Sequence, residues 1–151
     1  MVSPLALLTT FHGRINRAPF WFGLIVLLVI SFIGAYLIQP SYLNFETAQR
    51  PSLGMLIWEL IWFVPMMALT IKRCNDRNWP SWVPYLVGVI ALPMYIAPYF
   101  GRLMDPVNPT AIELAYWVII GVAGLFFFID NGFLRGTRGE NQYGPDPLST
   151  T

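Results

Sequence analysis

Residues 20–38 read FWFGLIVLLVISFIGAYLI, a run of 19 residues without a charged side chain. Because about 20 apolar residues in a helix cross the hydrocarbon core of a bilayer, this run predicts a membrane-spanning helix. A second run, residues 81–100, contains 20 residues without a charge. Only 11% of the chain is charged and 56% is hydrophobic, whereas a soluble domain carries about 25% charged residues. The composition therefore indicates an integral membrane protein.

The whole chain of 151 residues is expected to form a single membrane domain, an all-α bundle of four transmembrane helices. The predicted spans cover residues 19–39, 53–71, 81–100 and 111–129, and residues 130–151 form a polar tail. The first span follows Asn16, a residue type that caps helices, and stops before Pro40. The third contains Pro84, Pro93 and Pro98, which predict a kink or a shortened regular helix.

Basic residues are distributed unevenly between the two ends of this predicted bundle. Seven of the nine lie at the end that holds both termini: Arg14, Arg17, Lys72, Arg73, Arg77, Arg135 and Arg138. The two loops at the opposite end contribute Arg50 and Arg102. Since the cytoplasmic loops of membrane proteins carry an excess of Lys and Arg, we expect both termini to be cytoplasmic.

Three blocks at this end carry a family resemblance: GRINRAPFW from residue 13, VPMMALTIKRCNDRNWPSW from residue 64 and GTRGENQYGP from residue 136. Together they resemble the family catalogued as domain of unknown function 805, which consists of small bacterial inner-membrane proteins. The matching positions are Gly13, Arg14, Arg17, Phe20, Trp21, Pro65, Arg73, Asp76, Trp82, Gly139, Asn141, Tyr143, Gly144 and Pro145. The chain departs from the family pattern at Cys74 and Asn75, where the family has Leu-His. The resemblance implies an inner-membrane location and supports the four-span topology, but it implies no biochemical activity.

The charged and polar residues of these blocks form the first candidate site, which consists of Arg14, Arg17, Arg73, Asp76, Asn141 and Tyr143. One hypothesis is a closed polar cluster, in which Arg17 or Arg73 pairs with Asp76 and the tail fills the remaining donors. Arg17 in particular is expected to turn inward to Asp76. Two other interpretations stay open: these residues are orientation signals with ordinary headgroup contacts, or they form a dedicated site for an anionic ligand.

Glu59 is the second candidate, because an intramembrane carboxylate points to a proton relay or a cation contact. The alternative is a neutral carboxyl group that forms a hydrogen bond with a neighbouring helix. No Lys, Arg or His within the predicted spans is available to pair with it.

Enzyme classes find little support in the chain, which lacks a Walker loop, an HExxH motif and a CxxC motif. The lone cysteine, Cys74, and the lone histidine, His12, have no ligand spacing, so we expect no metal, no other cofactor and no catalytic residues. Nucleic-acid binding is not expected either, because the basic residues lie close to the membrane and form no separate domain.

Two functions remain after these exclusions. The first is a non-enzymatic scaffold or interaction protein of the bacterial inner membrane that engages lipid headgroups or a partner through a basic cytoplasmic face. The partner could be another membrane protein or a second copy of the chain. The second is a small, oligomeric transporter or channel with Glu59 in its pathway.

Overall fold

The computed structural model describes residues 4–43, 49–103 and 109–149, and within these ranges every regular element is a helix. The elements are α1 (Pro4–Thr9), α2 (Arg17–Ile38), the 3-10 helix η1 (Pro40–Leu43), α3 (Leu53–Asp76), α4 (Trp82–Ala91), α5 (Pro93–Ile96), the 3-10 helix η2 (Ala97–Phe100) and α6 (Ala111–Phe133). Four segments are long and apolar enough to cross a membrane: α2, α3, α6 and the composite of α4, α5 and η2. The prediction of an all-α protein with four spans is confirmed.

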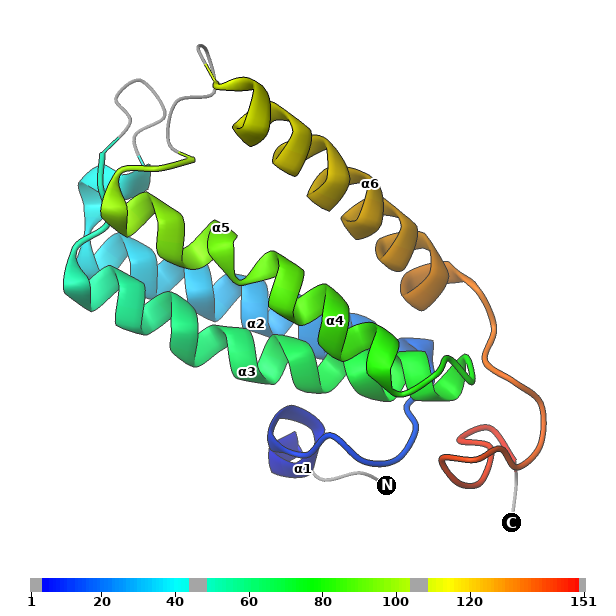
Figure 1. The fold of residues 1–151 in the computed structure, drawn as a ribbon. Coiled ribbons are helices and arrows are strands. Elements are labelled where there is room, and N and C mark those ends of the chain that lie inside the picture. Colours follow the sequence, from blue (N-terminus) through cyan, green and yellow to red (C-terminus); the bar gives the residue numbers. More distant parts are fainter. Residues whose placement is uncertain (1–3, 44–48, 104–108, 150–151) are drawn as a thin grey trace.

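The helices form a bundle in which α2 and α3 lie side by side and α4 to η2 run along α3 (Figure 1). Helix α6 runs to one side of this group at an angle to it (Figure 1), and its three buried residues, Asp130, Asn131 and Gly132, all lie near its C-terminal end. The N-terminal arm and the C-terminal tail lie at the same end, beside the turn between α3 and α4 (Figure 1). We call this the terminal end of the bundle, and the other the opposite end.

Glycines let α2 and α3 approach closely. A Cβ atom at Gly34 would overlap the indole ring of Trp58, and one at Gly23 would come within 2.9 Å of the Leu69 methyl groups. Trp58 also donates from Nε1 to the Ser31 carbonyl at 3.2 Å. Small residues at helix contacts favour association within a membrane, because burial of apolar surface from lipid provides little driving force there.

Two helices extend beyond their predicted spans at the terminal end. Helix α3 continues to Asp76, five residues past the predicted limit of 71, because its polar last turn is buried and hydrogen-bonded instead of facing solvent. Helix α6 continues to Phe133, so Asp130 and Asn131 lie in its last turn and not in the tail. At its start, the side chains of Thr110 and Glu113 form a capping box.

The third span is interrupted where its prolines predict. Helix α4 ends at Ala91, α5 begins at Pro93, and η2 contains Pro98. A proline removes a backbone donor from the helix and leaves earlier carbonyls without their usual partner. One carbonyl beside this break, that of Ile90, accepts a hydrogen bond of 2.8 Å from the Tyr116 hydroxyl of α6.

Candidate functional site

Three charged side chains meet at the terminal end of the bundle. Asp76, the last residue of α3, accepts hydrogen bonds at Oδ1 from Arg14 Nε at 3.1 Å and from Arg14 Nη2 at 3.0 Å. Arg73 donates from Nη1 to Oδ2 of the same carboxylate. Arg73 is 0% exposed, Asp76 3% and Arg14 7%. One carboxylate therefore bridges two buried guanidinium groups, and we call these three residues the Asp76 cluster.

Arg14 uses all of its hydrogen-bond donors within the protein. Besides its bonds to Asp76, its Nη1 donates to the carbonyls of Gly139 at 2.8 Å and Gly144 at 3.0 Å, and its Nη2 donates to that of Thr137 at 2.7 Å. A guanidinium group has five N–H donors, and these contacts account for all five. The N-terminal arm thereby holds the tail against the end of α3.

The C-terminal end of α6 is capped by side chains from other elements. The last carbonyls of a helix lack partners within it and carry the negative end of the helix dipole. Here five consecutive carbonyls accept side-chain hydrogen bonds: Asn131 and Leu134 from Arg73, Gly132 from Trp21, Phe133 from Arg17 and Arg135 from Arg77. These contacts explain how a helix that touches the bundle at few points is fixed at this end.

The expectation that Arg17 turns inward to Asp76 is wrong. Arg17 is exposed, and it donates from Nη1 to the Phe133 carbonyl at 3.1 Å. Arg14 takes the inward position because it precedes α2, in the arm that passes under the bundle, whereas Arg17 is the first residue of α2. Of the expected cluster members, the structure brings together Arg14, Arg73, Asp76 and the tail.

A second ion pair, between a buried aspartate and a partly exposed arginine, lies beside the Asp76 cluster and was missed by the sequence analysis. Asp130 of α6 accepts from Arg77 Nη2 at 3.1 Å and from Trp79 Nε1 at 3.1 Å. The sequence analysis assigned Asp130 to the tail. The available signal was an Asp-Asn pair at the end of an apolar run, at the same end of the predicted bundle as a loop rich in basic residues.

Lys72 and Asn75 connect α3 with the N-terminal arm, and neither was a predicted site residue. Lys72 is 1% exposed and donates from Nζ to the carbonyls of Ala6 and Leu7, at the end of α1. Asn75 donates from Nδ2 to the Gly13 carbonyl at 3.0 Å. A long cationic side chain thus serves as a cap for a short helix.

The tail forms a compact turn against the Asp76 cluster. Asn141 donates from Nδ2 to the Asn75 carbonyl at 3.0 Å, and the Tyr143 hydroxyl donates to the Trp79 carbonyl at 2.5 Å. Burial raises the pKa of Tyr143, which keeps its hydroxyl in the donating form. A Cβ atom at Gly136 would overlap the Asp76 carboxylate. The two predicted tail residues therefore hold the tail in place.

Glu59, the other candidate, lies far from this cluster, towards the opposite end. It lines a small cavity of about 130 Å³ between α2, α3 and α5. The Tyr42 hydroxyl of η1 faces the Glu59 side chain, and burial, together with this carboxylate, raises the pKa of Tyr42 to about 12. Glu59 Oε2 is buried and has no partner.

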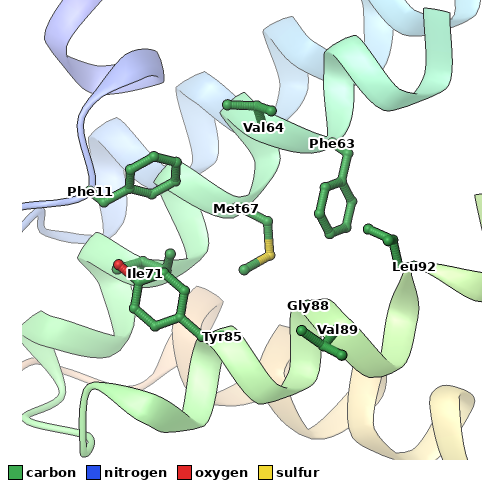
Figure 2. Close-up of a pocket in the computed structure, with 9 residues that line it drawn as sticks. All are labelled: Phe11, Phe63, Val64, Met67, Ile71, Tyr85, Gly88, Val89 and Leu92. Carbon is green, nitrogen blue, oxygen red and sulfur yellow. The ribbon is translucent and has the colours of Figure 1, made fainter. Parts of the chain in front are cut away.

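An apolar groove of about 240 Å³ lies between α3 and α4 (Figure 2). It is lined by Phe11, Phe63, Val64, Met67, Ile71, Tyr85, Gly88, Val89 and Leu92. Figure 2 shows Met67 of α3 extending between Phe63 and Ile71 towards the helix that carries Gly88. Since the Tyr85 hydroxyl is the single side-chain polar group of this lining, the groove suits hydrocarbon and offers little to orient a polar ligand.

No metal site was expected, and within the described ranges no group of three or more His, Cys, Asp or Glu side chains is placed to hold a metal ion. The polar groups at the terminal end form a closed network of ion pairs and main-chain caps. Fold and site together define a multi-pass helical membrane protein with a buried polar cluster at one end.

The chain belongs to the family described as "Protein of unknown function (DUF805)", which matches residues 8–145. It is 24% identical to the inner membrane protein YhaH of Escherichia coli K12, over 91% of this chain and 86% of that protein. It is 30% identical to the uncharacterized protein YiiR of the same strain, over 92% of this chain and 86% of that protein. No solved structure matches it. The predicted family and inner-membrane location are confirmed, and the chain is a multi-pass inner-membrane protein.

Proposed function

We propose that this protein is a non-enzymatic interaction protein of the inner membrane that engages anionic lipid headgroups or a protein partner through its basic terminal end. The observation that carries the proposal is a division among the basic residues at that end. Arg14, Lys72 and Arg73 are buried and bonded within the protein. Arg17, Arg135 and Arg138 are exposed.

The buried group provides rigidity and not a ligand site. An anion approaching Arg14 would have to replace hydrogen bonds that already use all five of its donors. Removing one partner of a buried ion pair costs about 3–5 kcal/mol, so such an exchange is unfavourable. This favours the Asp76 cluster as a support that holds the arm, the tail and α6 together.

The exposed group has the chemistry to contact phosphate. Guanidinium groups bind phosphate oxygens in a bidentate manner. Each basic residue near an anionic leaflet contributes about 1 kcal/mol. With both termini in the cytoplasm, as the distribution of seven basic residues against two predicts, the exposed arginines lie at the anionic inner leaflet.

Lipid retention tests this proposal. The triple variant Arg17→Ala, Arg135→Ala, Arg138→Ala is purified in detergent, and its bound phosphatidylglycerol is compared with that of the parent by native mass spectrometry. We expect weaker retention, by about 1 kcal/mol for each arginine. The matched control is Arg102→Ala, which removes an exposed arginine from the opposite end.

Equal retention by the triple variant and the parent would contradict the headgroup arm of the proposal. The partner arm has a separate measurement, because light scattering of the purified protein reports whether a second copy binds. If the protein is monomeric and retains no lipid through these arginines, the partner must be a different protein, which cross-linking in the native membrane then tests.

The transporter alternative requires a polar path across the membrane. Its support is the cavity at Glu59, which also contains Ser31 and Tyr95. Leu27 lines the same cavity and is 2% exposed, and Leu69, nearer the terminal end, is 0% exposed. A small cavity that ends at a dry helix contact favours a binding site over a continuous path across the membrane.

A further inference from the structure

The cavity around Glu59 has polar groups from three elements. Ser31 comes from α2, Glu59 and Trp62 from α3, and Tyr95 from α5. The rest of its lining is apolar. A cavity of about 130 Å³ has room for water, since one water needs about 10–15 Å³ of accessible space.

Two polar atoms at this cavity have no hydrogen-bond partner in the protein. They are Glu59 Oε2, an acceptor, and Trp62 Nε1, a donor. The two residues are three positions apart on α3 and therefore share a face of the helix. A buried polar atom that is left without a partner destabilises the fold. A water molecule both donates and accepts, so water in this cavity satisfies both groups.

Tyr42 connects the cavity with the opposite end of the bundle. Tyr42 lies in η1, after the end of α2, is half-buried, and faces the Glu59 side chain. The groups that face the carboxyl are Tyr42 from η1, Ser31 from α2 and Tyr95 from α5. Among the described residues that line the cavity, none is basic, so no protein cation balances a negative charge there.

The cavity is closed towards the terminal end. Leu69 follows Met66 by one turn of α3, is fully buried, and packs against Gly23 of α2. At its side the cavity reaches Leu28, which is 54% exposed. Lipid on that side carries no protons, so we expect proton exchange from the end where Tyr42 lies.

We propose that the cavity around Glu59 is a hydrated proton-binding site that exchanges protons with the opposite end of the bundle through Tyr42. When the proton leaves, the carboxyl O–H bond breaks and the carboxylate keeps the electron pair. The proton passes to water or along the Tyr42 hydroxyl, which gives up its own proton as it receives one. No other bond changes, and no oxidant or reductant is required.

Infrared difference spectroscopy of the full-length protein in phosphatidylcholine nanodiscs tests the site. The carbonyl stretching band of a protonated carboxyl group is followed as a function of pH, in H₂O and in D₂O. We expect one band that titrates, shifts in D₂O and is missing in Glu59→Gln. The matched control is Glu113→Gln, which removes a carboxylate from the start of α6 and should keep the band.

Tyr42→Phe tests the route, with Tyr36→Phe as the control, because Tyr36 is 59% exposed on the surface of α2. We expect deuterium exchange of the Glu59 band to slow about tenfold or more in Tyr42→Phe, as the loss of a positioned proton-transfer group predicts. Unchanged exchange in Tyr42→Phe would overturn the route. In the parent protein, a carboxyl band that does not shift in D₂O, or the absence of any titrating band, would overturn the assignment of a proton-binding site at Glu59.

Discussion

The carboxyl groups of Asp76, which is buried, and Glu59, which is half-buried, differ in the partners that surround them. Asp76 receives three hydrogen bonds from two arginines, and both of its oxygens are used. Glu59 has one contact, with a tyrosine, and its Oε2 is left without a partner. Both residues belong to α3: Asp76 is its last residue, and Glu59 lies in its first half.

This difference separates a structural charge from a reactive one. A carboxylate held between two guanidinium groups has both oxygens occupied and fixes the elements that carry its partners. A carboxyl group beside a cavity, without a cationic partner, has room for water and can exchange its proton with it. Burial of a carboxyl group therefore does not by itself indicate a function. The presence or absence of hydrogen-bond and cationic partners is the more informative property.

The strongest test of the comparison replaces one carboxyl from each region. Asp76→Ala leaves two buried guanidinium groups without their anion, and we expect a loss of about 3–5 kcal/mol in the free energy of unfolding. Glu59→Gln removes no ion pair and should change stability by less than about 1 kcal/mol. Reversible unfolding in mixed detergent micelles measures both. Equal losses would abolish the distinction between the two regions.

A second test uses two arginines of the same segment. Arg14→Ala removes all the bonds between the N-terminal arm and the tail carbonyls, and it should cost about 2–3 kcal/mol, because Asp76 retains Arg73. Arg17→Ala removes an exposed side chain, and we expect a change within about 0.5 kcal/mol. The same unfolding measurement applies. If Arg17→Ala proves the more damaging change, the assignment of Arg14 as the inward residue is wrong.

Close packing around Asp76 gives a third test with a smaller effect. Gly136→Ala places a methyl group against the Asp76 carboxylate and should cost about 1–3 kcal/mol, the usual penalty for overpacking. Gly121→Ala is its control, because a Cβ atom there meets nothing within 4 Å. Since alanine has the higher helix propensity, we expect the control to be neutral or slightly stabilising. A neutral Gly136→Ala would show that the tail does not press on the cluster.

The smallest effect concerns Asp146, a partly exposed carboxylate of the tail. Hydrogen bonds from the backbone N–H groups of Leu148 and Gly139 hold the pKa of Asp146 below its ordinary value. Because the pKa of Asp146 is lower in the folded protein than in the unfolded chain, its hydrogen bonds contribute fully to stability above the unfolded value of about 3.9. This stabilisation is lost as the pH falls through the folded pKa.

The tail turn should therefore loosen only in acid. Amide hydrogen exchange at Gly139 measures the effect, and Asp146→Asn corrects for the intrinsic pH dependence of exchange. If the parent and Asp146→Asn lose protection at the same pH, Asp146 plays no part in the turn.

Much of the candidate cluster could be predicted from the sequence. The three blocks GRINRAPFW, VPMMALTIKRCNDRNWPSW and GTRGENQYGP lie at the same end of a four-span chain, so their polar residues had to meet there. Their pairing could not be predicted. Arg14 and Arg17 lie three positions apart in the chain. Which of them pairs with Asp76 depends on where α2 begins, because Arg14 precedes the helix and Arg17 is its first residue. Asp130 and Lys72 were missed because hydropathy placed them outside the predicted spans, as loop or tail residues.

Hydropathy and the positions of proline are local properties, and they were sufficient for the class of protein, the number of spans and the break in the third span. The lack of charge in residues 20–38 permits few other structures, because a bilayer requires that a spanning segment satisfy its own backbone. Three features depend on contacts between residues that are distant in the chain. They are the choice of the arginine that reaches Asp76, the capping of α6, and the position of Glu59 at a cavity. Only the packing of α2, α3, α6 and the tail decided them, since the free energy of a buried charge depends on every group around it.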